Sequence, residues 1–152
     1  MGFLLGDNSA LIEKIKGILV FNIQGSNICI GLDAFSAVIN PNEVNPINSY
    51  SEIKERIISY KGNVIPLVDI HAYLGFDKAV LTDKSHLILL EKEERKVAFI
   101  VDAVLELVSF DRYIKETLSI KPPHNGNALY ELEFEGRKIL MPDFDTIYSL
   151  VN

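Results

Sequence analysis

The chain has 152 residues, and its 15 basic and 21 acidic side chains give a net charge of −6. This length fits one domain or two small subdomains fused together, and the acidic balance works against binding of nucleic acid. Cys29 is the single cysteine, so an internal disulfide is excluded, and the lack of a CxxC motif removes most zinc sites.

Apolar runs in the sequence are short. None approaches the roughly 18 to 20 consecutive apolar residues that a membrane-spanning helix needs. The beginning of the chain also lacks the basic region and the long apolar stretch of a secretory signal. We therefore expect a cytoplasmic protein that does not insert directly into a membrane.

The N-terminal part is predicted to contain an extension at 1–14 that precedes a main domain at 15–152. The extension has helical spacing, because Leu11 and Ile15 fall on one face of a helix. The main domain starts with a β-hairpin at 18–32, where two apolar runs flank a turn of polar residues and glycine. Short apolar runs separated by turn residues predominate in the rest of the chain, and they predict an all-β fold.

The middle of the chain combines a predicted helix with a predicted strand. Ser51 is a candidate N-cap for a helix that carries Ile57 on its apolar stripe. Residues 60–70 then join a glycine turn to an apolar strand that Pro66 interrupts. Because proline lacks the backbone N–H that a ladder needs, this strand is expected at a sheet edge or at a bulge. Residues 71–75 suit one helical turn that ends at a glycine.

The last third of the chain contains two further hairpins and a helix. Residues 86–101 form the first hairpin, and its charged connection at 91–96 is predicted to be a solvated tip. Residues 130–141 form the second, in which apolar residues alternate with glutamates ahead of a glycine turn. The Pro-rich stretch at 122–127 has the composition of a loop, and Asp143 is the expected N-cap of a C-terminal helix. No strict sequence repeat relates these segments.

Residues with catalytic chemistry are few. Asp69 and His71 are a candidate orienter and base of a small hydrolase, but side chains two apart in an extended chain point the same way without the hydrogen bond that would aim the imidazole. Cys29 lies in an apolar strand, where a lone thiol usually packs as a small apolar group. The sequence contains no phosphate-binding loop, zinc-protease or serine-hydrolase motif. These observations favour a protein that acts through its surface.

Three segments, in the same order along the chain, resemble signatures of the CheW-like domain family, the coupling proteins of bacterial chemotaxis. Residues 60–75 are similar to the RGxxxPVVDLxxxLG signature, with lysine in place of the arginine. Residues 97–104 resemble the VGLLVDxV strand, and residues 136–143 resemble the closing GRxxxLLD segment. With the opening hairpin in the expected place, the resemblance covers residues 15–151.

This resemblance implies two five-stranded SH3-like barrels that share a hydrophobic core, with short helices that include a C-terminal one. It implies a non-enzymatic adaptor that needs no cofactor. Its expected partners are the regulatory domain of a chemotaxis histidine kinase and the cytoplasmic tip of chemoreceptors. The matching motif places partner contacts at Lys61, Gly62 and Asn63, and Arg56 and Val38 are further candidates.

The chain departs from the family pattern at four positions. Lys61 replaces the signature arginine, and the glutamate that often partners this arginine in the family falls at Ala37. Glycines that are common in the family fall at Arg56 and Tyr130. Loss of both ends of an ion pair is chemically coherent, because an unpaired buried charge is costly. An alternative function is therefore a coupling protein of a related pathway such as surface motility, and the small hydrolase is a weaker alternative.

Overall fold

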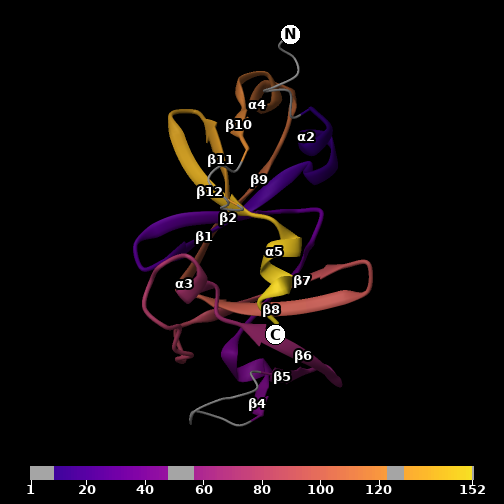
Figure 1. Ribbon diagram of the computed structural model, residues 1–152, viewed down its shortest axis with the longest axis vertical. Coiled ribbons are helices and arrows are strands. Elements are labelled where there is room, and N and C mark those ends of the chain that lie inside the picture. Colours follow the sequence, from indigo (N-terminus) through magenta and orange to yellow (C-terminus); the bar gives the residue numbers. More distant parts are fainter. Residues whose placement is uncertain (1–8, 48–56, 123–128, 152) are drawn as a thin grey trace.

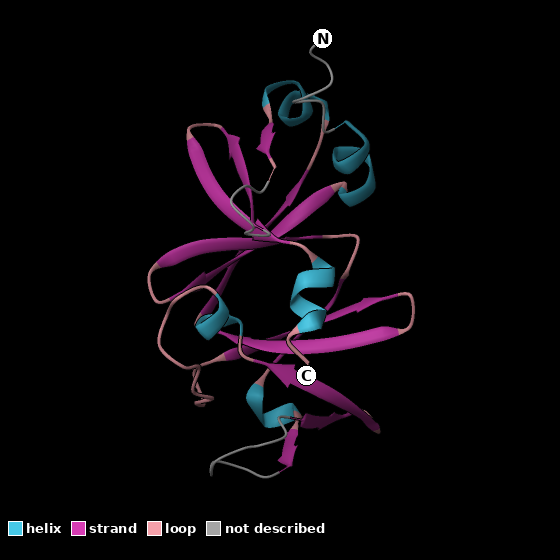
Figure 2. Ribbon diagram, viewed as in Figure 1, coloured by secondary structure: helices cyan, strands magenta, loops and turns pink. Residues whose placement is uncertain are grey.

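The computed structural model describes residues 9–47, 57–122 and 129–151, which form two β-sheets and several short helices (Figures 1 and 2). The strands are β1 (Gly17–Ile23), β2 (Ser26–Gly31), β3 (Phe35–Ile39), β4 (Asn45–Ile47), β5 (Ile57–Tyr60), β6 (Asn63–Val68), β7 (His86–Lys92), β8 (Arg95–Val101), β9 (Ala103–Ser109), β10 (Ser119–Lys121), β11 (Leu129–Phe134) and β12 (Arg137–Pro142). The helices are α2 (Ser9–Ile15), the 3₁₀ helix η1 (Pro41–Glu43), α3 (Ile70–Tyr73), α4 (Arg112–Thr117) and α5 (Phe144–Ser149). None of the helices within these ranges has the length and apolar character that a bilayer crossing demands.

Each sheet has six strands. The first sheet has the order β10-β11-β12-β2-β1-β9, and the second has the order β3-β7-β8-β6-β5-β4. The all-β prediction is confirmed in its coarser form, a mostly-β fold of two sheets with short helices, but each sheet has six strands where five were predicted for each barrel. Both β4 and β10 are only three residues long. Segments this short carry no readable periodicity, which explains why the sequence pattern missed them.

The two sheets repeat one topology, although the sequence shows no strict repeat. In each sheet a central hairpin, β1–β2 or β7–β8, has one strand paired in parallel with β12 or β6. In each, the edge strand next to the hairpin, β9 or β3, has a register shift in its pairing. The strand that pairs in parallel is then followed by a helix with an aspartate N-cap, Asp143 or Asp69. The fold is therefore built from two corresponding halves, one for each sheet. Each half combines the hairpin from one part of the chain, β1–β2 or β7–β8, with four strands from the other part, β9–β12 or β3–β6.

In each sheet the strands at the two edges are consecutive in the chain. Residues 40–44 join β3 to β4, and residues 110–118 join β9 to β10. A flat sheet of this size would separate its edges by about 24 Å. A connection of five residues reaches at most about 20 Å when extended, and three residues of 40–44 are in the 3₁₀ helix. The edges of the second sheet are therefore drawn toward each other, and this sheet curls. The nine residues of 110–118 could span a flat first sheet, but the ion pair between Glu106 of β9 and Arg137 of β12 shows that the first sheet also curls.

A shared apolar core joins the two sheets. Phe21 of β1 and Phe99 of β8 are fully buried in it, with ring centroids 5.4 Å apart. Figure 1 shows α5 leaving β12 and passing toward β7 and β8 of the other sheet, where Phe144 and Ile147 enter the same core. Separate apolar clusters lie within each half. This arrangement fixes the relative position of the two halves.

Most local predictions are confirmed. The three predicted hairpins form, and their turns are centred on Gln24–Gly25, Glu93–Glu94 and Glu135–Gly136. The solvated tip of the second hairpin is shorter than expected, because β7 and β8 extend into the charged run as far as Lys92 and Arg95. The predicted loop at 122–127 lies almost wholly outside the described residues.

Two predictions in the middle of the chain are wrong. Ile57 begins β5 instead of lying on a helix, and the predicted cap Ser51 falls outside the described residues. Pro66 lies in β6, which is an interior strand between β5 and β8. The pairing of β6 with β8 begins only at Leu67. The missing N–H of Pro66 therefore falls just before the ladder on that side, which is why an interior strand tolerates it.

Candidate partner-binding surface

The β5–β6 turn carries three of the predicted contact residues, Lys61, Gly62 and Asn63. Lys61 and Gly62 have φ angles of 50° and 80°, and Tyr60 pairs with Asn63 across the hairpin. Positive φ at both central residues is what a tight type I′ turn requires. A Cβ atom added at Gly62 would have no atom within 4 Å. Glycine is therefore favoured here by the positive φ angle and not by close packing, and the tip of the turn is not covered by other atoms.

Lys61 presents a cation at this tip. Its ammonium lies 5.3 Å from the centroid of the Tyr60 ring. It makes no ion pair with a carboxylate among the residues that the structure describes. The Asn63 side-chain amide donates to the backbone oxygen of Lys61 at 3.4 Å. The turn is thus held by local contacts, and its charge is available to an acidic partner surface.

Val38 does not join this turn in the same way. Val38 is on β3, at the opposite end of the strand order from β5, and it is 37% exposed. Arg56 lies outside the described residues. The structure therefore brings Lys61, Gly62 and Asn63 together, and places Val38 on the edge strand that the curl of the sheet draws toward them.

The corresponding turn of the other half contains an ion pair that the sequence reading missed. Glu106 of β9 pairs with Arg137, which follows Gly136 of the β11–β12 turn. By register, Glu106 faces Val20 of the central hairpin as Ala37 faces Leu89 in the other half. The half that carries Lys61 has Ala37 at the position of this carboxylate, and Asn63 at the position of Arg137. The spacing signal was present: Gly62 precedes Asp69 by as many residues as Gly136 precedes Asp143.

The hydrolase alternative fails on geometry. The Asp69 carboxylate is the N-cap of α3 and accepts from the Ala72 and Ala79 backbone N–H groups at 3.0 and 3.4 Å. His71 is buried, and its Nε2 donates to the backbone oxygen of Ile100 at 2.9 Å. Neither residue orients the other, so no base is prepared for catalysis. His71 instead ties α3 to β8.

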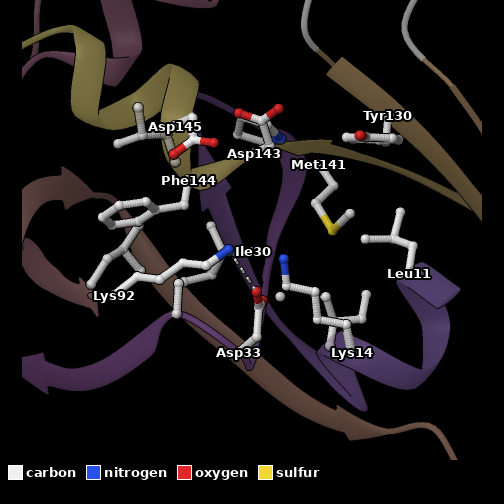
Figure 3. Close-up of a pocket in the computed structure, with 16 residues that line it drawn as sticks. Leu11, Lys14, Ile30, Asp33, Lys92, Tyr130, Met141, Asp143, Phe144 and Asp145 are labelled. Carbon is white, nitrogen blue, oxygen red and sulfur yellow. Dashed lines mark hydrogen bonds and ion pairs between the residues drawn. The ribbon is translucent and has the colours of Figure 1, made fainter. Parts of the chain in front are cut away.

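A small cavity of about 180 Å³ lies between α2, α5 and the strands β2, β7 and β12 (Figure 3). Lys14 and Lys92 point toward Asp33 in this cavity (Figure 3), and the Lys92 ammonium lies 3.5 Å from the Asp33 carboxylate. A side-chain hydrogen bond with Lys14 raises the pKa of Lys92, and the Asp33 and Asp145 carboxylates act in the same direction, whereas burial opposes them.

The other carboxylates at this cavity already have structural partners. Asp143 accepts from the Thr146 backbone N–H at 2.8 Å as the N-cap of α5. Asp145 pairs with Arg95 at 3.2 Å. The charged groups therefore fasten α5 to the hairpin of the second sheet. Among the described residues, no group of three or more His, Cys, Asp or Glu side chains is arranged to hold a metal ion.

Comparison with known proteins identifies the fold and the family. The family model described as CheW-like domain matches residues 17–149. A chemotaxis protein CheW from Rhizobium meliloti is 26% identical over 135 residues, which cover 88% of this chain and 87% of that protein. A chemotaxis protein CheW from Thermotoga maritima is 23% identical over 130 residues, which cover 86% and 85%.

A solved structure has the same fold. The scaffolding protein TtCheW from Thermoanaerobacter tengcongensis superposes with a TM-score of 0.63 and 24% sequence identity. The superposition covers 83% of this chain and 87% of that protein.

Proposed function

This chain belongs to the CheW-like domain family, and we propose that it is a cytoplasmic adaptor that couples chemoreceptors to a chemotaxis histidine kinase. The observation that carries this proposal is the family match over residues 17–149, which takes in both sheets. The curated relatives named as chemotaxis proteins support the general role. The protein is not an enzyme, and the Asp69 and His71 geometry agrees with that.

The proposed mechanism is simultaneous binding. A protein–protein interface of standard size buries about 800 Å² on each partner. Two such faces on one rigid molecule hold two partners at a high effective concentration without any chemical step. The shared core around Phe21 and Phe99 supplies the rigidity, because it prevents the two halves from moving independently. We propose the kinase regulatory domain and the cytoplasmic tip of a chemoreceptor as these partners.

The proposed contact surface is centred on the β5–β6 turn. Lys61, Gly62 and Asn63 form its tip, and the exposed Val64 adds apolar area next to it. The Lys61 ammonium lacks an ion pair within the described chain, which supports an acidic group on the partner. Val38 and Arg56 are proposed as peripheral contacts of the same surface.

We also propose the finer architecture that the family resemblance implies. Each curled sheet would form an SH3-like barrel of five principal strands, with β4 or β10 as the short added strand. Residues 15–152 would make up the domain and residues 1–14 an extension. The helix α2 spans Ser9–Ile15, and Leu11 packs against the core of the first half.

One observation favours a related pathway as a second candidate. The half with the proposed surface has Ala37 and Lys61 where the family pattern has a glutamate and an arginine, whereas the other half has an ion pair of its own between Glu106 and Arg137. An altered surface on an intact fold is what retuning toward another receptor or kinase set would produce. A coupling protein for surface motility is therefore the alternative to chemotaxis.

Isothermal titration calorimetry with the regulatory domain of a chemotaxis histidine kinase from the same genome tests the proposal. We expect binding in the micromolar range, and we expect Lys61→Glu to weaken it about tenfold. Lys78→Glu is the matched control, because Lys78 is also exposed and lies in the loop after α3. Absence of binding by the wild type at high micromolar concentration would reject the proposed function. Equal affinities of the two variants would reject the proposed surface.

A further inference from the structure

The proposed coupling surface makes no use of the cavity between α2, α5 and the strands β2, β7 and β12 (Figure 3). This cavity lies where the two halves meet, because α2 packs on the core of the first half and β7 belongs to the second sheet. Its volume is about 180 Å³. An engineered protein cavity of roughly 150 Å³ is enough to bind benzene. The space therefore suffices for a small organic molecule.

The charges that line this cavity leave one cation without an ion pair. The two carboxylates at the start of α5 have the structural partners described above, and Lys92 pairs with Asp33. Lys14 makes no ion pair with a carboxylate within the ranges that the structure describes. One positive charge at the cavity therefore lacks a counter-charge.

Lys14 and Lys92 are held close to each other. Both side chains point toward Asp33 (Figure 3), and their amino groups lie within hydrogen-bonding reach of one another. Ammonium groups have donors and no acceptor, so two of them repel each other unless an acceptor lies between them. Asp33 meets this need only in part, because its carboxylate is 3.5 Å from the Lys92 ammonium, whereas strong charge-assisted hydrogen bonds measure about 2.7 to 2.9 Å. The two lysines therefore have donors left for a second carboxylate.

Most residues that line the cavity are apolar. Four different elements contribute large apolar side chains to it, namely Leu11, Ile30, Met141 and Phe144. Figure 3 shows the Met141 side chain extending from β12 toward the two lysines. Burial of an aromatic or branched aliphatic group against such walls is favourable. The lining thus suits a molecule that combines one carboxylate with a compact apolar body.

We propose that this cavity binds a small organic monocarboxylate, whose carboxylate lies between the Lys14 and Lys92 ammonium groups and whose apolar body contacts Met141. A single negative charge matches the single cation that lacks an ion pair. A dianion would be repelled by Asp33 and by the carboxylates at the start of α5. The bound acid joins α2 to β7 and so bridges the two halves. The cavity contains no residue of the β5–β6 turn, so this proposal and the proposed coupling surface can fail independently.

Methionine-methyl NMR of the full chain tests the proposal. The chain has two methionines, Met1 and Met141, so one of the two methyl signals reports on the cavity and the variant Met141→Leu identifies it. Sodium benzoate is the probe, because its aromatic ring displaces the resonance of a methyl group that it contacts. We expect a saturable displacement of the Met141 signal with a dissociation constant of about 1 mM, as a ligand of this size allows. Benzamide, which has the same ring without the negative charge, should bind about tenfold more weakly.

Two lysine variants locate the charge that matters. Lys14→Gln should weaken benzoate binding about tenfold, and it should fold normally because Lys14 is exposed. Lys78→Gln is the matched control, because it removes the same charge at an exposed position outside the cavity, and it should bind benzoate as the wild type does. Circular dichroism confirms that each variant is folded.

Each other outcome overturns the proposal. A Met141 signal that does not move at benzoate concentrations up to about 20 mM, well above the expected dissociation constant, overturns it. Benzamide that binds as tightly as benzoate shows that the cavity does not select a carboxylate. A Lys14→Gln variant that keeps the wild-type affinity, or a Lys78→Gln variant that loses as much, shows that the lysine pair does not form the site.

Discussion

Glu106 of β9 and Arg137 of β12 form an ion pair, although β1 and β2 lie between their strands in the order of the first sheet. A contact across four strands is possible only because the sheet curls. The Arg137 guanidinium also lies 5.4 Å from the centroid of the buried Phe134 ring. Arg137 therefore joins the edge strand β9 to the β11–β12 hairpin.

We predict a measurable but small coupling between these two side chains. The side chain of Arg137 is 32% exposed and that of Glu106 is 44% exposed, so solvent and salt screen the attraction between them. A double-mutant cycle with Glu106→Gln and Arg137→Gln, followed by urea unfolding, should give about 0.5 to 1 kcal/mol. The Lys138–Glu131 pair, at 4.0 Å, is the control and should give a smaller value. Equal coupling in the two pairs would show that Arg137 has no special role in the curl.

Arg95 is predicted to stabilise the attachment of α5 to the second sheet. Its guanidinium lies 4.9 Å from the Phe144 ring centroid and 5.3 Å from that of Tyr148, and it pairs with Asp145. Arg95→Ala should lower the free energy of unfolding by about 1 to 2 kcal/mol. Arg95→Lys should recover less than half of this loss, because an ammonium lacks the planar stacking surface. Full recovery by lysine in urea unfolding would contradict the stacking contribution.

Cys29 is predicted to make stability fall at alkaline pH. Burial raises the pKa of this thiol well above its ordinary range, and the Arg137 charge opposes the shift only in part. The folded protein therefore keeps the proton while the unfolded chain releases it near pH 8.5. Above that pH the free energy of unfolding should fall by about 1.4 kcal/mol per pH unit from this group.

The variant Cys29→Ala isolates this effect. Lys92, whose pKa is also raised, is present in both proteins, so its contribution cancels in the comparison. Urea unfolding between about pH 8 and pH 10 should give a shallower decline for the variant than for the wild type. Parallel declines would show that the thiol does not remain protonated in the folded state.

Restoring the family's charge pair should change partner affinity. The double variant Ala37→Glu with Lys61→Arg places a carboxylate at the position that corresponds to Glu106 in the other half. We expect the affinity for the kinase regulatory domain to change by about two- to fivefold, as a partly exposed charge pair allows. The double variant Ala37→Gln with Lys61→Arg controls for side-chain size. If both double variants bind as the wild type does, these positions do not determine partner choice.

Local signals predicted much of the fold. Asp143 was expected to cap the C-terminal helix, and its carboxylate accepts from the Thr146 backbone N–H. The hairpins could be predicted from the sequence because turns of glycine or polar residues separate apolar runs of strand length. The assignment of Ile57 to a helix was wrong because pairing with Pro66 across the β5–β6 hairpin outweighs the helical spacing around it. The strand β10 was missed because three residues show no period.

The candidate surface was predictable only in part. The turn at Lys61 and Gly62 follows from the motif, since a tight hairpin needs glycine where φ is positive. The Glu106–Arg137 pair joins residues 31 apart in sequence, and its formation depends on the curl of a whole sheet. Periodicity within one segment carries no information about such a contact.

Assembly of three components tests most directly whether this chain bridges two partners. The kinase regulatory domain is immobilised, a soluble fragment of the chemoreceptor tip is added, and capture of the fragment is followed as the concentration of this chain increases. Bridging predicts that capture depends on this chain, rises to a maximum and falls when excess chain occupies each partner separately. If the chain binds each partner alone but never holds both, so that the receptor fragment displaces the kinase domain, the adaptor mechanism is contradicted.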